Sequence, residues 1–170
     1  MYAFELKLNM DCENILALYS PVANDLRYVL SVLRTNYNLE RVGDYAYNIA
    51  TLVRDLEHPI DQECIVEMGI KDMFDTALKM LNNTLSAFEK EDSQLAREVF
   101  HKDELLDQIK MRSNAVASDL IKRKPDEAIN ILSLLSVIRK LERVGDQTKN
   151  MAEELVFYLE AKVLRHGNKT

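Results

Sequence analysis

The stretch LERVGDYAYNIA, residues 39–50, is the most informative in this chain, because it returns 102 positions later as LERVGDQTKNMA, residues 141–152. Both copies keep a Glu, an Arg, a Gly, an Asp and an Asn at the same relative places. A motif kept only for core packing would preserve apolar residues and let the polar ones change. A repeat that preserves polar residues therefore indicates two halves that share a chemical task.

Length and composition favour an all-α protein. A chain of 170 residues can form one well-buried domain or two small units packed side by side. Glycine and proline are sparse, at four and three residues, which is typical of long helices with few tight turns. The net charge of −6 disfavours nucleic acid and anionic membrane as partners, since both require a concentrated basic surface.

The cysteines and the apolar runs indicate the cellular compartment of the protein. Cys12 and Cys64 belong to no CxxC motif or Cys/His cluster, so neither a disulfide framework nor a zinc site is indicated. No apolar run approaches the roughly 20 residues that span a bilayer, and no signal peptide precedes the first helical stretch. We therefore expect a cytoplasmic protein.

Apolar residues at three- and four-residue spacing predict five helices. A short one precedes Pro21, and a long one follows it through the first LERVGD copy. The remaining three are expected at about residues 62–88, 94–124 and 126–164, separated by the polar breaks HPID, EKEDS and KRKPDE. Pro125 suits the first turn of the last helix.

Acidic residues four positions apart lie on one face of a helix, and this pattern occurs three times. The pairs are Glu40 with Asp44, Glu142 with Asp146, and Asp103 with Asp107. A single such pair is ordinarily only a solvated acidic face.

The position of the third pair suggests more than a solvated face. An antiparallel hairpin that closes at Lys124 and Pro125 would set Asp103 level with Asp146, and Asp107 level with Glu142. Four carboxylates at one height require cations, and oxygen ligands suit Mg²⁺, Mn²⁺, Ca²⁺ or iron.

Two further residues of the motif allow two interpretations. Gly43 and Gly145 each cost about 1 kcal/mol relative to Ala inside a helix, so each position needs a reason for its glycine. Close helix packing and space for a metal or ligand beside the carboxylates are both reasons, and we expect a mixture. Asn48 and Asn150 either form hydrogen bonds that orient the carboxylates or are ordinary surface residues.

Taken together, the doubled LERVGD motif with its Asn, the segment SPVANDLR at residues 20–27 after CENILALY, and DELLD at residues 103–107 resemble the PhoU family of phosphate-signalling proteins. The resemblance covers nearly the whole chain. It implies two tandem antiparallel three-helix bundles whose E/DxxxD motifs hold clusters of iron, zinc, Mg²⁺ or Mn²⁺. By position, Asp103, Asp107, Glu142 and Asp146 would form the second cluster, and Glu40 and Asp44 would contribute to the first.

The function that the resemblance implies is regulatory and not catalytic. PhoU-like proteins connect the ATPase of a phosphate ABC transporter to a sensor kinase, and they repress the phosphate-starvation response when phosphate is plentiful. On this basis we expect those two proteins as partners.

The chain departs from the family pattern in its first repeat, whose opening helix is not present. We therefore predict an incomplete first repeat at residues 1–59 and a complete second repeat at residues 60–170. Glu5 is the only nearby acidic substitute for Asp103 and Asp107 in the first repeat. An apolar groove left open there is usually covered by another chain, so a homo-oligomer, most simply a homodimer, is expected.

Three other functions are compatible with a helical bundle of this kind. One is the cytoplasmic PhoU-like domain of a sodium/phosphate symporter, and another is a metal-free helical scaffold. The third, a di-iron enzyme, is disfavoured because such sites ordinarily use two Glu-x-x-His pairs and this chain does not have two.

Overall fold

The structure is a computed structural model, and it describes residues 2–56 and 58–164. Every regular element within these residues is helical, which confirms the all-α prediction. In chain order the elements are α1 (Tyr2–Tyr19), α2 (Ala23–Arg54), α3 (Gln62–Glu67), α4 (Ile70–Lys90), α5 (Ser93–Arg123), the 3₁₀ turn η1 (Pro125–Glu127) and α6 (Ala128–Glu160). No helix in the part of the chain that the structure describes is long and apolar enough to cross a membrane.

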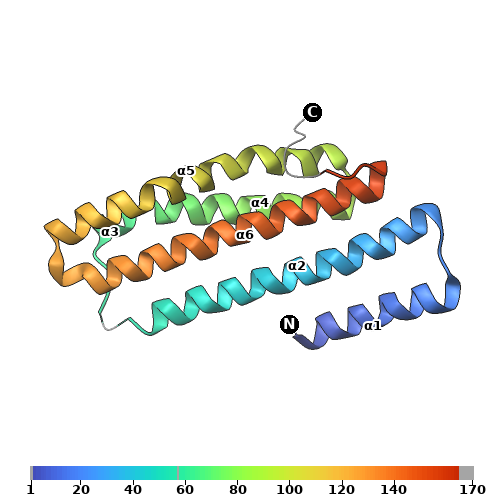
Figure 1. Ribbon diagram of the computed structural model, residues 1–170, viewed down its shortest axis with the longest axis horizontal. Coiled ribbons are helices and arrows are strands. Elements are labelled where there is room, and N and C mark those ends of the chain that lie inside the picture. The colour runs from blue at the N-terminus through green and yellow to red at the C-terminus, as the bar shows by residue number, and fades with distance from the viewer. Residues whose placement is uncertain (1, 57, 165–170) are drawn as a thin grey trace.

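Helix α6 lies at the centre of the molecule and packs against α2, α4 and α5 (Figure 1). Helices α4, α5 and α6 form a three-helix bundle, and α2 lies along the opposite side of α6. The two are antiparallel, since Ser31 near the start of α2 donates to the Glu154 carbonyl near the end of α6, at 2.8 Å. Helix α1 folds back along α2. The division into repeats at residues 1–59 and 60–170 stays a prediction.

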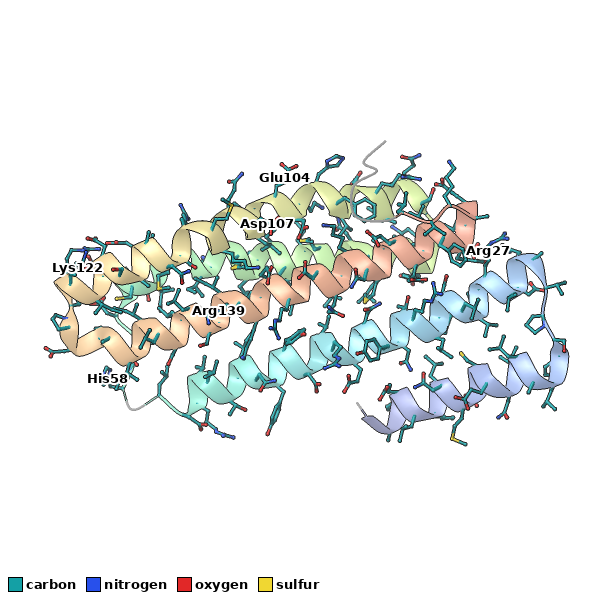
Figure 2. All side chains as sticks on the ribbon, viewed as in Figure 1. Arg27, His58, Glu104, Asp107, Lys122 and Arg139 are labelled. Atoms are coloured by element: carbon teal, nitrogen blue, oxygen red, sulfur yellow. The ribbon has the colours of Figure 1, made fainter. Side chains whose placement is uncertain are left out.

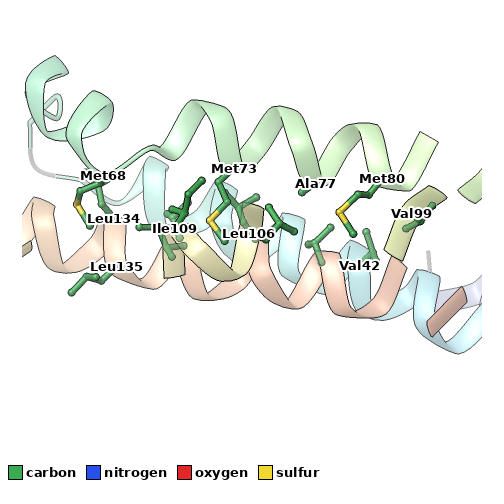
Figure 3. Close-up of a cluster of buried hydrophobic side chains, with 14 of the residues drawn as sticks. Val42, Met68, Met73, Ala77, Met80, Val99, Leu106, Ile109, Leu134 and Leu135 are labelled. Atoms are coloured by element: carbon green, nitrogen blue, oxygen red, sulfur yellow. The ribbon is translucent and has the colours of Figure 1, made fainter. Parts of the chain in front are cut away.

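The hydrophobic core runs along the inside of the α4–α5–α6 bundle (Figure 3). Met73 and Met80 of α4, Leu106 of α5 and Ile138 and Leu155 of α6 are completely buried. Methionine adapts to irregular gaps between helices, which suits a core built from three long, gently crossing helices. This core fixes the register of α5 against α6, and with it the positions of the acidic residues.

The predicted chain breaks occur where proline or a capping residue ends a helix. Helix α1 ends at Tyr19 before Pro21, as expected. Pro125 begins the 3₁₀ turn η1 that leads into α6, and not α6 itself. At the α4–α5 turn, the Asp92 side chain accepts hydrogen bonds from the Gln94 and Leu95 amides, a typical N-cap.

One prediction about the helices is wrong. The run at residues 62–88 is not one helix but two, because α3 ends before Met68 and α4 begins at Ile70. Gly69 between them has φ +68°, in the left-handed region that favours glycine. The apolar periodicity continues across the break, so it gave no sign of this bend.

Candidate metal centre

The α5–α6 hairpin brings the second LERVGD copy against the DELLD segment. Asp103 on α5 lies across from Gly145 on α6, because a Cβ built on Gly145 would be 3.6 Å from the Asp103 Oδ1 atom. Asp103 is therefore at the height of Asp146, where the hairpin argument placed it. Asp103 and Glu142 are buried, at 6% and 9% exposure, and Asp146 is half-buried.

Gly145 is explained by packing in this arrangement. A Cβ at this position would overlap the Leu106 side chain, which is itself completely buried. A side chain at residue 145 would therefore force Leu106 to shift and disturb the close approach of α5 to α6. The same approach brings Asp103 close to the α6 backbone.

Two lysines pair with the buried carboxylates. Lys149 on α6 donates to the Asp103 Oδ2 atom across the hairpin, at 2.6 Å, and Lys110 on α5 donates to Glu142. Each pair joins α5 to α6, so the two lysines neutralise charge and also hold the hairpin. The hydrogen bond to Glu142 raises the pKa of Lys110. For Lys149, burial lowers the pKa, but the hydrogen bond to Asp103 and the charges of nearby carboxylates together raise it above its usual value.

Asp146 is half-buried and close enough to both pairs for their charges to act on it. Its burial raises the pKa of its carboxyl group, and the nearby charges of Glu142 and Asp103 raise it further. Lys110 and Lys149 oppose this shift only in part. A carboxylate in such a position is one that an additional cation would stabilise.

Asp107 is on the solvent side of the same hairpin. It is exposed on α5, where Figure 2 labels it, and its charge acts on Lys110. The structure thus places Asp103, Asp107, Glu142 and Asp146 around one stretch of the hairpin, but two of them are bound to lysines. Among the described residues, no three His, Cys, Asp or Glu side chains are close enough together to hold a metal ion.

The donor set nevertheless fits a hard cation. Its ligands are carboxylate oxygens, two of the four residues are buried, and the charge of Asp146 is only partly compensated by the lysines, which matches what Mg²⁺, Mn²⁺ or iron require. Metal binding would require Glu142 and Asp103 to exchange their lysine contacts for the ion.

The first LERVGD copy has a different environment on α2. Glu40 is partly exposed and Asp44 is exposed. Asn36, one turn before Glu40, donates to the Glu5 carbonyl of α1 at 3.0 Å and to the Asn9 side chain. Glu5 therefore lies near the Glu40 end of the motif. Asn48 hydrogen-bonds the Asp44 main-chain oxygen and not a carboxylate.

Sequence reasoning missed the two lysines. The signal for Lys149 was a difference between the copies, since the matching residue in the first copy is Tyr47. Lys110 lies seven residues after Asp103 and therefore on the same face of α5.

The sequence contains a single Glu-x-x-His pair, Glu98 with His101, and both side chains are exposed on α5.

An apolar cleft lies beside the first half of α6. Its volume is about 810 Å³, and it is lined by the end of α2, the segment that follows with α3, the start of α4 and the first half of α6. Leu134, Val137 and Leu141 form its buried floor, while Val53 and Phe74 are exposed on opposite walls.

The fold and the site define an all-helical bundle protein with a repeated acidic motif along its long helices. The family model described as PhoU domain matches residues 1–53 and 70–155, and the chain therefore belongs to the PhoU family.

Individual relatives agree with this assignment. A phosphate-specific transport system accessory protein PhoU homolog from Thermotoga maritima is 33% identical over 156 residues, which cover 89% of this chain and 66% of the relative. The chain thus spans about two thirds of the length of that protein. The crystal structure of PhoU from Pseudomonas aeruginosa matches with a TM-score of 0.88 at 27% identity, covering 95% of this chain and 77% of that one. The regulatory protein PhoU from Streptococcus pneumoniae matches with a TM-score of 0.76 at 30% identity, covering 95% of this chain and 74% of that one.

Proposed function

We propose that this protein is a non-catalytic, cytoplasmic regulator of phosphate uptake and phosphate-starvation signalling. The observation that carries the proposal is the family match over residues 1–53 and 70–155, which includes both copies of the LERVGD motif. Relatives named as accessory proteins of a phosphate-specific transport system support the transporter as the object of regulation. The partners that follow are the transporter ATPase and the sensor kinase of the phosphate response.

Binding to these partners is the direct test. The purified chain would be immobilised and titrated with the purified ATPase subunit and with the cytoplasmic part of the sensor kinase from the same organism. We expect saturable binding to at least one of them. If neither binds, the regulatory proposal is wrong for this chain.

The metal site forms the second part of the proposal. Asp103, Asp107, Glu142 and Asp146 would bind the ion or ions on the α5–α6 hairpin, with Glu40 and Asp44 contributing to a first site on α2. When bound, the metal would supply positive charge and hold α5 and α6 in one arrangement. Protein purified without chelator should carry metal, and Asp103→Ala with Asp146→Ala should lose it. Equally low metal in both proteins would contradict the proposal.

A metal-free scaffold is the competing function, and one observation favours it. Lys110 and Lys149 already provide counter-charges to Glu142 and Asp103, so the two buried carboxylates are paired without a metal ion. The metal analysis separates the two functions. A domain of a sodium/phosphate symporter would share the same bundle, and the coding sequence upstream of Met1 would distinguish it.

A further inference from the structure

The arginine of the LERVGD motif is the one shared charged residue of the repeat that the proposed metal sites do not use. Arg41 on α2 and Arg143 on α6 are both exposed. Helices α2 and α6 lie side by side and antiparallel, with Ser31 at the height of Glu154 (Figure 1). Ten residues after Ser31 is Arg41, and ten before Glu154 is Val144, the neighbour of Arg143. The two motif arginines therefore lie level with each other along the helix pair.

Both arginines lie on the surface seam between α2 and α6. The Arg143 guanidinium is over the ring of Tyr45 of α2, with its Cζ atom 5.9 Å from the ring centre. Tyr37 and Tyr45 lie one turn before and one turn after Arg41, so the three residues share one flank of α2. Arg41 donates two hydrogen bonds to the Tyr37 hydroxyl, at 3.1 and 2.8 Å, and lies over its ring. We refer to Tyr37, Arg41, Tyr45 and Arg143 as the arginine seam.

The acidic residues of the first motif lie on a different flank of α2. Glu40 and Asp44 follow Asn36 at intervals of four residues, and Asn36 donates to the Glu5 carbonyl of α1, so this flank is directed toward α1. In the part of the chain that the structure describes, neither Arg41 nor Arg143 forms an ion pair with a carboxylate. Both guanidinium groups are thus available to a carboxylate from outside the chain.

A polar groove continues the seam toward the end of α6. Its volume is about 470 Å³; Tyr37 borders it on α2, and Asn150, the asparagine of the second motif copy, lines it on α6. Arg34 also lines the groove, but it is paired with Glu154 at 3.1 Å. The groove therefore offers room for polar side chains beside the two unpaired arginines.

The composition of the seam is typical of a protein interface. Arginine and tyrosine are among the residues that most often carry the binding energy of such interfaces. Stacking on a ring also holds each guanidinium group in place, so less side-chain entropy is lost on binding. A small anion would gain little here, because an ion pair in open solvent is weak. A protein surface that covers the seam would exclude water and strengthen the same pairs.

We infer that the arginine seam is a docking surface for a protein partner that presents Asp or Glu side chains, with Arg41 and Arg143 each binding a carboxylate. This role gives both motif copies a reason to keep their arginine, separate from the acidic residues beside it. The inference rests on the proposed regulatory function, because it requires a protein partner, but it does not require a bound metal.

Titration of the full chain with the transporter ATPase and with the cytoplasmic part of the sensor kinase tests the inference. Arg41→Glu and Arg143→Glu should each weaken binding by roughly tenfold, and the double variant should weaken it further. Arg41→Lys should retain only part of the affinity, because an ammonium group cannot form two parallel bonds to a carboxylate. Arg54→Glu is the matched control, since it lies thirteen residues after Arg41 and on another side of α2.

Two further measurements separate docking from a general loss of structure. The variants should match the wild type in helical circular dichroism and in metal content, because both arginines are exposed. Salt should weaken the wild-type complex more than that of the double variant. If neither protein binds the wild type, the regulatory function and this surface both fail. If one binds, but the double variant binds it as tightly or Arg54→Glu weakens it equally, this surface alone is wrong.

Discussion

At residue scale, Gly145 shows how a single missing side chain positions the acidic site. Its Cα–H face lies against Leu106, and the two residues allow α5 and α6 to approach where Asp103 meets the second motif. For Gly145, close packing is thereby confirmed as one of the two expected reasons for the glycine. The other reason, space for a ligand, stays a prediction.

Gly145→Ala should destabilise the fold even though alanine is the better helix former. Helix propensity contributes about 1 kcal/mol in favour of alanine, and overpacking against a fully buried leucine costs about 1 to 3 kcal/mol. We expect a net loss of roughly 1 kcal/mol in the free energy of unfolding, measured with urea. The double variant Gly145→Ala/Leu106→Ala should lose less stability than the sum of the losses in the two single variants, because the smaller residue 106 removes the overlap. A loss equal to that sum would contradict the packing explanation.

Lys149 should have opposite effects on stability and on metal affinity. Lys149→Met leaves the buried Asp103 carboxylate without its contact at 2.6 Å, and we expect a loss of about 2 kcal/mol in stability without metal. In the proposed site the same lysine competes with the ion, so Lys149→Met should bind Mn²⁺ or Mg²⁺ more tightly in a calorimetric titration. Lys122→Met, at an exposed position on α5, serves as the control. Unchanged or weaker metal binding in Lys149→Met would argue against competition.

At the scale of elements, Gly69 is the hinge that separates α3 from α4. Its positive φ directs α3 toward the end of the α5–α6 hairpin, where Arg123 contacts Glu63 and Glu67, and Lys124 contacts Asp61 and Glu63. These ion pairs hold α3 against the hairpin, although each exposed pair contributes little alone.

Gly69→Ala should lower the free energy of unfolding by about 1 to 2 kcal/mol, because an L-residue is disfavoured in the left-handed region. The added Cβ would also lie 3.0 Å from the Arg112 Nη2 atom, a contact that the arginine must relieve. Gly69→Asn tolerates this backbone better and should cost less than alanine. Thermal or urea unfolding of the three proteins would check the order, and a Gly69→Ala protein as stable as the wild type would show that the bend is not strained.

The elements also show what the sequence could predict and what it could not. Pro21, Asp92 and Pro125 act locally, so the breaks beside them were predictable from the residues alone. The height of Asp103 along α6 was predictable from the position of the turn. Two antiparallel helices rise by the same distance per residue, so residues equally far from the turn lie level with each other. Gly69 was missed because apolar spacing continues through the bend. Lys110 and Lys149 were missed because pairing across helices depends on side-chain reach, which spacing does not encode.

At the scale of the whole molecule, one end of the bundle is closed by a network around the end of α6. Arg97 of α5 contacts Glu160 at 2.9 Å, and Arg27 of α2 donates to the Tyr158 carbonyl. Tyr158 in turn donates to Glu91 in the α4–α5 turn, at 3.0 Å. The end of α6 is therefore connected to α2, α4 and α5 at once.

The stability that Glu160 contributes at this end of the bundle depends on pH. Hydrogen bonds from Ser93, Arg97 and Lys162 lower the pKa of its carboxyl group to about 2, from a usual value of 4.5. Because the pKa of Glu160 is lower in the folded state than in the unfolded state, its carboxylate stabilises the fold fully above the unfolded pKa. This stabilisation is lost as the pH falls from about 4.5 toward about 2.

Glu160→Gln should therefore be less stable than the wild type at pH 7, by about 1 kcal/mol after allowance for the partial exposure of the pair. The difference between the two proteins should shrink as the pH falls through the same window, because the wild type then loses its charge as well. Urea unfolding of both proteins at pH 7, 4 and 3 measures this difference. Glu98→Gln, at an exposed position on α5, should show no comparable change. A constant difference across the window would mean that Glu160 acts through its shape and not through its charge.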